Sequence, residues 1–260
     1  MFTVVTHLPS PLIQECELTF IASEPIDFAK AAKQHQNYCT MIEKCGALVI
    51  ILNDNLLLPD SVFIEDPIII FDEVAVLTSM GVESRRKELS TLKNFFRQYR
   101  YVEQISLPAR IEGGDVLKVG RNIFVGRSPR TNDHGILALR NIIKPFGYAV
   151  IPVNVTGCLH LKTGCTALDE KTILINPDWI DTTPFVGYTT IETLPDEPFG
   201  ANILPIGETI CMNTAYPKTV ERVRSLGYTI EETDISEFVK AEAGLTCMSV
   251  PFCQHPTANN

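Results

Sequence analysis

Short apolar runs alternate with amphipathic stretches along the chain, and the same order recurs several times. Residues 74–107, 123–153 and 210–234 each begin with an apolar strand, turn into an amphipathic helix and end in a returning strand. Gly147 and Gly227 stand where a helix-ending glycine is expected. The pattern therefore predicts an α/β protein built from repeated strand–helix–strand units.

The two ends of the chain and one weaker segment extend this repeat. Residues 2–8 and 47–52 read as strands around a helix at 25–46, and residues 172–194 form a weaker unit. About five ββαβ-type units result, and closing them around a centre would bury all their apolar faces. No Pro/Gly/Ser-rich linker interrupts the chain, so we expect one domain spanning residues 1–260.

Composition narrows the function classes. The chain is 45% hydrophobic and 20% charged with a net charge of −9, and it has no basic block, which argues against nucleic acid and anionic membranes as partners. No apolar run reaches the length of a membrane span, and the N-terminus does not read as a signal peptide. We expect a cytoplasmic protein with reduced thiols. The eight cysteines include no C-x-x-C pair, which argues against a common structural zinc site.

Acidic side chains flank two strands that the pattern assigns to the core. Asp60, Glu65 and Asp66 surround one strand, and Glu112 and Asp115 precede another. The aspartates have a plain alternative reading as turn caps, but glutamate is a poor turn residue. Several carboxylates at strand ends would repel one another unless a cation lies among them.

Basic residues and a histidine also stand in unusual positions. Arg85 and Arg130 lie at predicted helix starts, where positive charge opposes the helix dipole. They are either solvated surface residues or bidentate ligands for a carboxylate. His160 falls in a predicted apolar strand, where a hydrogen-bonded structural histidine is the commoner case. With Cys158 and Cys165 it could be read as a metal site, although the spacing fits no established pattern.

Taken together, these residues fit a ligand with a cation at one end and a carboxylate at the other, as in an arginine-like molecule. Six segments, in order, then resemble the dimethylarginine dimethylaminohydrolase family: "PDSVFIEDP", "ESRRKE", "RIEGGDVLKVG", "VGRSPRTNDHG", "LHLKTG" and "GLTCMSV". The resemblance covers nearly the whole chain. It implies membership of the guanidino-group-modifying superfamily, whose fold is a five-bladed α/β propeller.

The resemblance also implies residue roles. Cys247 corresponds to the nucleophile, His160 to the general acid and base, and Glu112 to the acid that supports the histidine and the substrate. Leu18 corresponds to a lid position that contacts substrate through its backbone. The implied substrate-binding residues are Leu18, Asp60, Glu65, Asp66, Arg85, Arg130, Ala241 and Glu242.

The implied reaction is hydrolysis of Nω-methylated arginines to L-citrulline and dimethylamine or methylamine through a covalent cysteine–amidine intermediate. The expected partner is a small cationic amino acid, with no metal and no organic cofactor, and a homodimer is left open. Free cysteine titrates near 8.5, whereas a guanidinium about 4 Å away would stabilise the thiolate by up to ~4 kcal/mol. We therefore expect the substrate, more than the protein, to activate Cys247.

Several points stay open at this stage. The family pattern before the catalytic segment is an apolar residue, Asp and Gly, whereas this chain reads Ala241-Glu242-Ala243-Gly244, at the end that recognises the substrate's α-amino group. Substrate choice is also open, because another Nω-substituted arginine, such as Nω-hydroxyarginine, or arginine itself fits the same residues. A non-catalytic propeller that binds an arginine derivative or a macromolecule is the alternative of another class. Cys253 reads as a tail thiol.

Overall fold

The computed structural model of the protein describes residues 1–254. Within them, fifteen strands form five sheets of three strands each. In every sheet the middle strand pairs antiparallel with one neighbour and parallel with the other. The sheets, in the order antiparallel neighbour, middle strand and parallel neighbour, are β15 (Ser249–Cys253), β1 (Phe2–His7) and β2 (Leu48–Leu52); β3 (Ile68–Ile70), β4 (Val74–Leu77) and β5 (Tyr101–Gln104); β6 (Val116–Val119), β7 (Asn122–Arg127) and β8 (Ala149–Asn154); β9 (Cys165–Ala167), β10 (Thr172–Ile175) and β11 (Thr189–Glu192); β12 (Leu204–Ile206), β13 (Thr209–Asn213) and β14 (Thr229–Thr233).

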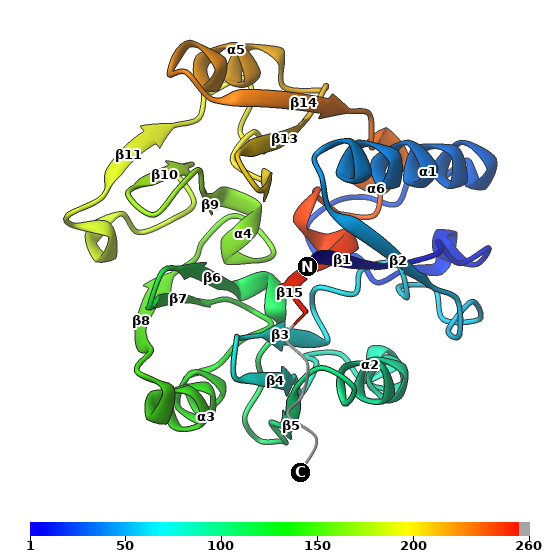
Figure 1. Ribbon diagram of the computed structural model, residues 1–260. Coiled ribbons are helices and arrows are strands. Elements are labelled where there is room, and N and C mark those ends of the chain that lie inside the picture. The colour runs from blue at the N-terminus through cyan, green and yellow to red at the C-terminus, as the bar shows by residue number, and fades with distance from the viewer. Residues whose placement is uncertain (255–260) are drawn as a thin grey trace.

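An α-helix connects four of the five parallel pairs, as is usual for a crossover between parallel strands. The α-helices are α1 (Phe28–Lys44), α2 (Leu89–Phe96), α3 (Asp133–Ile143), α4 (Leu161–Gly164), α5 (Pro217–Ser225) and α6 (Ser236–Val239). The 3₁₀ turns are η1 (Ile13–Glu15), η2 (Ser84–Glu88), η3 (Gly113–Asp115), η4 (Lys144–Phe146), η5 (Thr183–Phe185) and η6 (Thr246–Met248). Figure 1 shows the five sheets set around a common centre, with α1, α2, α3 and α5 on the outside. None of the helices within residues 1–254 is long and apolar enough to cross a membrane.

The predicted α/β repeat is confirmed, and its units at 74–107, 123–153 and 210–234 are found as strand, helix and strand. The weaker unit at 172–194 has its two strands, but the connection contains only the 3₁₀ turn η5. A single domain over residues 1–260 stays a prediction, and its last six residues lie outside the described part of the chain.

Three local predictions were wrong. His160 is not in a strand: its backbone is extended, and it immediately precedes the short helix α4. Arg85 lies in the 3₁₀ turn η2, and the α-helix begins only at Leu89. The first long helix begins at Phe28, where the side chain of Asp27 accepts a hydrogen bond from the Lys30 amide, so Pro25 lies before the helix.

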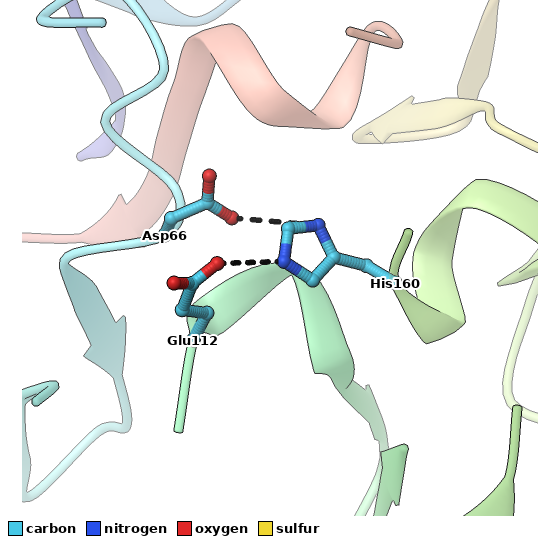
Figure 2. Close-up of side chains that lie close together, drawn as sticks. All are labelled: Asp66, Glu112 and His160. Atoms are coloured by element: carbon cyan, nitrogen blue, oxygen red, sulfur yellow. Dashed lines mark hydrogen bonds and ion pairs between the residues drawn. The ribbon is translucent and has the colours of Figure 1, made fainter. Parts of the chain in front are cut away.

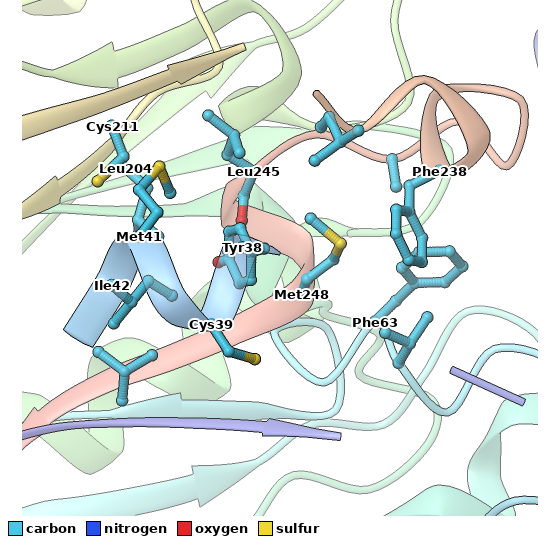
Figure 3. Close-up of a cluster of buried hydrophobic side chains, with 14 of the residues drawn as sticks. Tyr38, Cys39, Met41, Ile42, Phe63, Leu204, Cys211, Phe238, Leu245 and Met248 are labelled. Atoms are coloured by element: carbon cyan, nitrogen blue, oxygen red, sulfur yellow. Dashed lines mark hydrogen bonds between the residues drawn. The ribbon is translucent and has the colours of Figure 1, made fainter. Parts of the chain in front are cut away.

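One buried cluster connects the first helix to the last strand of the chain. Figure 3 shows α1 side chains such as Tyr38 and Ile42 packed against Leu245 and Met248 from the C-terminal segment. The Tyr38 hydroxyl donates to the Leu245 carbonyl at 2.8 Å and lies 2.7 Å from the Ser249 hydroxyl. Burial of this aromatic side chain therefore fixes the backbone on both sides of Cys247.

Candidate active site

Each unit places a polar side chain just before the strand that pairs antiparallel with the middle strand. Asp66 precedes β3, Glu112 precedes β6, His160 precedes β9, Asn202 precedes β12 and Cys247 precedes β15. These strands lie towards the centre of the ring (Figure 1), so segments far apart in sequence converge there. Asp66, His160 and Cys247 line one small cavity of about 20 Å³.

His160 faces two carboxylates that lie on the same side of its ring (Figure 2). Its Nε2 is 2.8 Å from Glu112 Oε2, and its Nδ1 is 3.9 Å from Asp66 Oδ1. All three side chains are buried, and Glu112 is completely so. The imidazole is therefore held in one orientation by acids from two other units.

This environment favours the charged form of the imidazole. Burial opposes the charge, but Asp66, Asp115 and Glu112 outweigh it and raise the pKa of His160 to about 9. Burial likewise opposes the two carboxylates, yet the charge of His160 lowers the pKa of Asp66, and its hydrogen bond and charge lower the pKa of Glu112. At neutral pH the group is thus an imidazolium flanked by carboxylates.

The two glycines after Glu112 allow this close approach. A Cβ on Gly113 would lie 2.0 Å from the Glu65 carbonyl oxygen. A Cβ on Gly114 would lie 2.6 Å from His160 Nδ1 and 2.8 Å from Asp66 Oδ1. The Gly114 amide also donates to Asp66 Oδ1 at 3.2 Å. Glycine is required here by crowding between units, in addition to any role in a turn.

The two predicted arginines are both buried, so the solvated-surface alternative does not hold for either of them. Arg85 donates to Asp66 at 2.7 Å, to both oxygens of Glu88 at 3.1 and 3.0 Å, and to the Phe63 carbonyl at 2.9 Å. A guanidinium has five N–H donors, so these four contacts leave about one for a ligand. The Arg130 guanidinium makes fewer contacts with protein acceptors than that of Arg85. Its Nη1 is 3.5 Å from Glu112, and its Nη2 donates to the Thr19 hydroxyl at 2.8 Å.

Cys247 lies in the 3₁₀ turn η6 and is held by backbone contacts. Its Sγ accepts from the Gly244 amide at 3.3 Å, and its carbonyl accepts from the Glu65 amide at 3.2 Å. Burial, followed by the charges of Glu65 and Asp66, raises the pKa of the Cys247 thiol to about 12. In this arrangement the protein alone does not provide a thiolate near neutral pH.

The remaining predicted residues separate into two groups. Asp60, Ala241 and Glu242 line the same cavity as Cys247, whereas neither Leu18 nor Glu65 does. Leu18 lies between Glu17, whose amide donates to Asp60, and Thr19, whose hydroxyl accepts from Arg130.

Glu65 points to the other side of the ring centre. It is paired with Lys162 at 2.5 Å, accepts from the Thr246 hydroxyl at 2.8 Å, and lines a separate cavity of about 560 Å³. Its predicted contact with a substrate stays a prediction.

Asp66, Glu112 and His160 also offer three ligand atoms within 4.8 Å of one another, which could hold a metal ion. The guanidiniums of Arg85 and Arg130 each lie against one of these acids, at 2.7 and 3.5 Å. Positive charge so close disfavours a divalent cation, and the same groups suit a planar monocation that can share the carboxylates. The cluster is therefore less suited to a divalent metal ion than to a planar monocation.

Comparisons with known proteins agree with this geometry. Residues 15–184 match the family described as N,N dimethylarginine dimethylhydrolase, eukaryotic. The N(G),N(G)-dimethylarginine dimethylaminohydrolase of Pseudomonas aeruginosa is 33% identical over 87% of this chain and 90% of that protein. The protein of the same name from Streptomyces coelicolor is 34% identical over 93% of each. The chain belongs to the dimethylarginine dimethylaminohydrolase family.

A solved structure of a dimethylarginine dimethylaminohydrolase extends the match to three dimensions. The Pseudomonas aeruginosa protein, as a Cys-to-Ser variant complexed with citrulline, superposes with a TM-score of 0.92 at 32% identity, covering 97% of this chain and all of that one. The predicted family membership is thus confirmed.

Three residues that the family resemblance did not single out also hold this dimethylarginine dimethylaminohydrolase-type site together. Asp115 accepts from the Leu161 amide at 2.9 Å and from the Thr131 hydroxyl at 2.6 Å. Lys162 is paired with Glu65, and the Asn202 side chain contacts both the amide and the hydroxyl of Thr246. The sequence did mark Asp115 as an acid before an apolar strand, with a turn cap as its plain alternative. Asn202 carries no comparable signal.

Proposed function

We propose that this chain hydrolyses asymmetric dimethylarginine and monomethylarginine to L-citrulline and dimethylamine or methylamine. The observation that carries the proposal is one small cavity lined by the thiol of Cys247, the imidazole of His160 and the carboxylate of Asp66. The fold and family that the comparisons show support the same reaction.

The charges around the cavity suit the substrate. Four carboxylates and two guanidiniums line it, together with His160. The excess of acids favours a cation, and Asp66 and Glu112 are placed to hold a guanidinium in a fixed orientation. Arg130 is the better placed of the two arginines for the substrate carboxylate, because its fork is committed to fewer protein acceptors.

We assign the first half-reaction to Cys247 and His160. The thiolate attacks the guanidino carbon and forms a C–S bond, giving a tetrahedral adduct. The imidazolium of His160 then gives its proton to the methylated nitrogen, the C–N bond breaks, and the amine leaves as a neutral molecule. A protonated histidine is needed for this step, and the pKa of about 9 provides one at neutral pH.

The second half-reaction uses the same residues in reverse. Neutral His160 takes a proton from water, and the oxygen attacks the amidine carbon of the covalent intermediate. The C–S bond breaks, the thiol is restored, and L-citrulline is released. Water is the only co-reactant, and the balance needs neither an oxidant nor a reductant.

The substrate itself supplies the activation that the protein lacks. A guanidinium about 4 Å from Sγ would stabilise the thiolate by up to ~4 kcal/mol, or roughly three pH units in the thiol pKa. Because burial and two carboxylates raise the pKa of Cys247 to about 12 in the free protein, attack becomes favourable only once the cation is bound.

Three finer expectations belong with this proposal. We propose that the five sheets are the blades of one α/β propeller, since each sheet repeats the same strand pairing. A cytoplasmic location and a homodimer stay predictions.

Citrulline formation from asymmetric dimethylarginine tests the proposal, with wild type compared to Cys247→Ala and Cys253→Ala. Cys253 is exposed in β15 and provides the matched thiol control. We expect Cys247→Ala to lose roughly 10³-fold or more of kcat and Cys253→Ala to keep full activity. Activity that survives in Cys247→Ala would overturn the assignment.

The substrate is tested by the same assay with other arginines. Monomethylarginine should be turned over, whereas faster citrulline formation from Nω-hydroxyarginine or arginine would transfer the proposal to a sister activity. No citrulline from any of them would support a non-catalytic binding protein.

A further inference from the structure

A short segment borders the small cavity, which its Glu17 helps to line. This lid, residues 17–20, follows the 3₁₀ turn η1 and precedes helix α1. Its Glu17 amide lies 3.3 Å from Asp60 Oδ1, its Glu17 carboxylate accepts from the Ser84 hydroxyl at 2.5 Å, and its Thr19 hydroxyl accepts from Arg130. The lid is thus hydrogen-bonded to residues that line the cavity.

The closed lid leaves too little room for a substrate. A cavity of about 20 Å³ has space for roughly one water molecule, far less than an arginine derivative needs. Entry to Cys247 therefore requires this part of the wall to move. The groups that hold the lid closed determine how often that happens.

Glu242 makes two further short contacts with the lid. Its Oε2 accepts from the Thr19 amide at 2.5 Å and its Oε1 from the Phe20 amide at 2.6 Å. Both carboxylate oxygens are thus used on two consecutive backbone N–H groups of the lid, and such charge-assisted hydrogen bonds are strong. The contact joins segments more than two hundred residues apart in sequence.

The backbone of Glu242 is left-handed just after helix α6, where the Ala243 amide donates to the Phe238 carbonyl at 3.1 Å, as is common at helix ends. Its φ is +57°, and within residues 1–254 it is the single non-glycine residue with positive φ. A glutamate in this region is strained, and such strain persists only where surrounding contacts hold it. Its carboxylate is hydrogen-bonded to the two lid amides, and its own amide donates to the Val239 carbonyl at 3.1 Å.

We propose that Glu242 is a latch that holds the lid closed over the small cavity and thereby sets how readily an arginine derivative reaches Cys247. Glu242 is then a positioning residue for the lid. The claim about access of an arginine derivative rests on the proposed function. The claim that Glu242 holds the lid closed does not depend on it. The sequence expectation that Glu242 binds substrate is the rival explanation, in which the carboxylate meets the α-ammonium group directly.

Opening of the lid is measured without substrate. Hydrogen exchange of the Thr19 and Phe20 amides, and alkylation of Cys247 by iodoacetamide followed on its peptide by mass spectrometry, are compared in wild type, Glu242→Gln and Glu242→Gly. Loss of one charge-assisted acceptor should raise the exchange rate and the alkylation rate by roughly tenfold or more. Both rates should be higher in Glu242→Gly than in Glu242→Gln. Rates equal to those of wild type would overturn the latch.

Two comparisons separate a latch from a general loss of structure. Glu242→Gly removes the carboxylate but also relieves the positive-φ strain, so its melting temperature should not fall below that of wild type. Glu24→Gln changes an exposed acid that follows the lid in sequence and whose carboxylate has no hydrogen bond to residues 1–254. This substitution should leave the exchange and alkylation rates unchanged. An equal rise in Glu24→Gln would attribute the effect to charge and contradict the latch.

A pair of substrates distinguishes the latch from direct recognition. Kcat/KM is measured for asymmetric dimethylarginine and for its analogue without the α-amino group, in wild type and Glu242→Gln. A latch changes both values by the same factor, within about twofold, because it acts before either substrate is bound. A change confined to the substrate with the α-amino group would assign Glu242 to recognition. If no citrulline forms at all, the proposed function fails while exchange and alkylation still decide the latch.

Discussion

Asp115 shows how one buried carboxylate connects several segments of the candidate site. One oxygen accepts from the backbone amide that follows His160, and the other accepts from the hydroxyls of Ser128 and Thr131. Thr131 in turn accepts from the Glu112 amide at 3.2 Å, and Ser128 accepts from the Arg130 amide at 3.0 Å. A single acid therefore connects the backbones that carry the histidine, the glutamate and the arginine.

The sequence identified most of these polar residues but could not assign their partners. Acids beside apolar strands and arginines at predicted helix starts were visible as violations of the expected pattern. That Arg85 binds Asp66 and Glu88, and that Glu242 reaches the lid, depends on side chains from other units. Such contacts are long-range, and local patterning carries no information about them.

The activity should depend steeply on pH. With the pKa of Cys247 at about 12 and that of His160 at about 9, the reactive thiolate–imidazolium form grows with pH until the histidine loses its proton. Kcat/KM should therefore rise about tenfold per pH unit from roughly pH 6 to 8 and level off close to pH 9. The measurement is the pH profile of citrulline formation at low substrate concentration. A flat profile between pH 6 and 8 would show that the free protein already holds a thiolate.

Among the secondary-structure elements, the strand ends of the repeated units are what position the site. Of the strands that begin after the site residues, the hydrophobic pattern predicted β3 and β6, beside Asp66 and Glu112, but it did not mark β9, β12 or β15 as strands. The pattern failed at His160, where the apolar neighbours Leu159 and Leu161 suggested a strand. Those side chains instead flank an extended residue that leads directly into α4, because the Leu161 amide is taken by Asp115.

Helix α1 should influence catalysis although none of its side chains lines the small cavity. Replacing Tyr38 by Phe keeps the ring but leaves the Leu245 carbonyl and the Ser249 hydroxyl without this partner. We expect a loss of about 1–3 kcal/mol in the free energy of unfolding and a lower kcat, because the turn that carries Cys247 lies between those two groups. Urea unfolding and citrulline assays measure both quantities.

Tyr101→Phe is the matched control for that substitution. Tyr101 is 68% exposed at the start of β5, so its change should stay within about 0.5 kcal/mol. If Tyr38→Phe behaves like Tyr101→Phe in both assays, the link between α1 and Cys247 is wrong.

In the molecule as a whole, the two ends of the chain close the ring. Strand β1 pairs with β2 on one side and with β15 on the other, so the first and last strands share a sheet. Phe252 of β15 packs with Phe96 and Tyr99 of the neighbouring unit at ring-centroid distances of 5.3 and 5.1 Å. The segment that carries Cys247 is therefore fixed by closure of the ring.

Weakening the closure should destabilise the entire fold. Phe252 is 4% exposed, and Phe252→Ala should lower the free energy of unfolding by about 3–5 kcal/mol. Phe146→Ala, at a residue 37% exposed on the outer side of the ring, should cost clearly less. Thermal unfolding of the two variants makes the comparison, and equal losses would argue that β15 is only peripherally attached.

The central claim is that Cys247 becomes covalently linked to the guanidino carbon. Its most direct test is mass spectrometry of the protein mixed with asymmetric dimethylarginine and quenched in acid during the first turnovers. The predicted result is a mass gain on the Cys247 peptide equal to dimethylarginine minus dimethylamine, with the Cys253 peptide unchanged. Citrulline formation with the adduct on another residue, or with no adduct at any quench time, would contradict it.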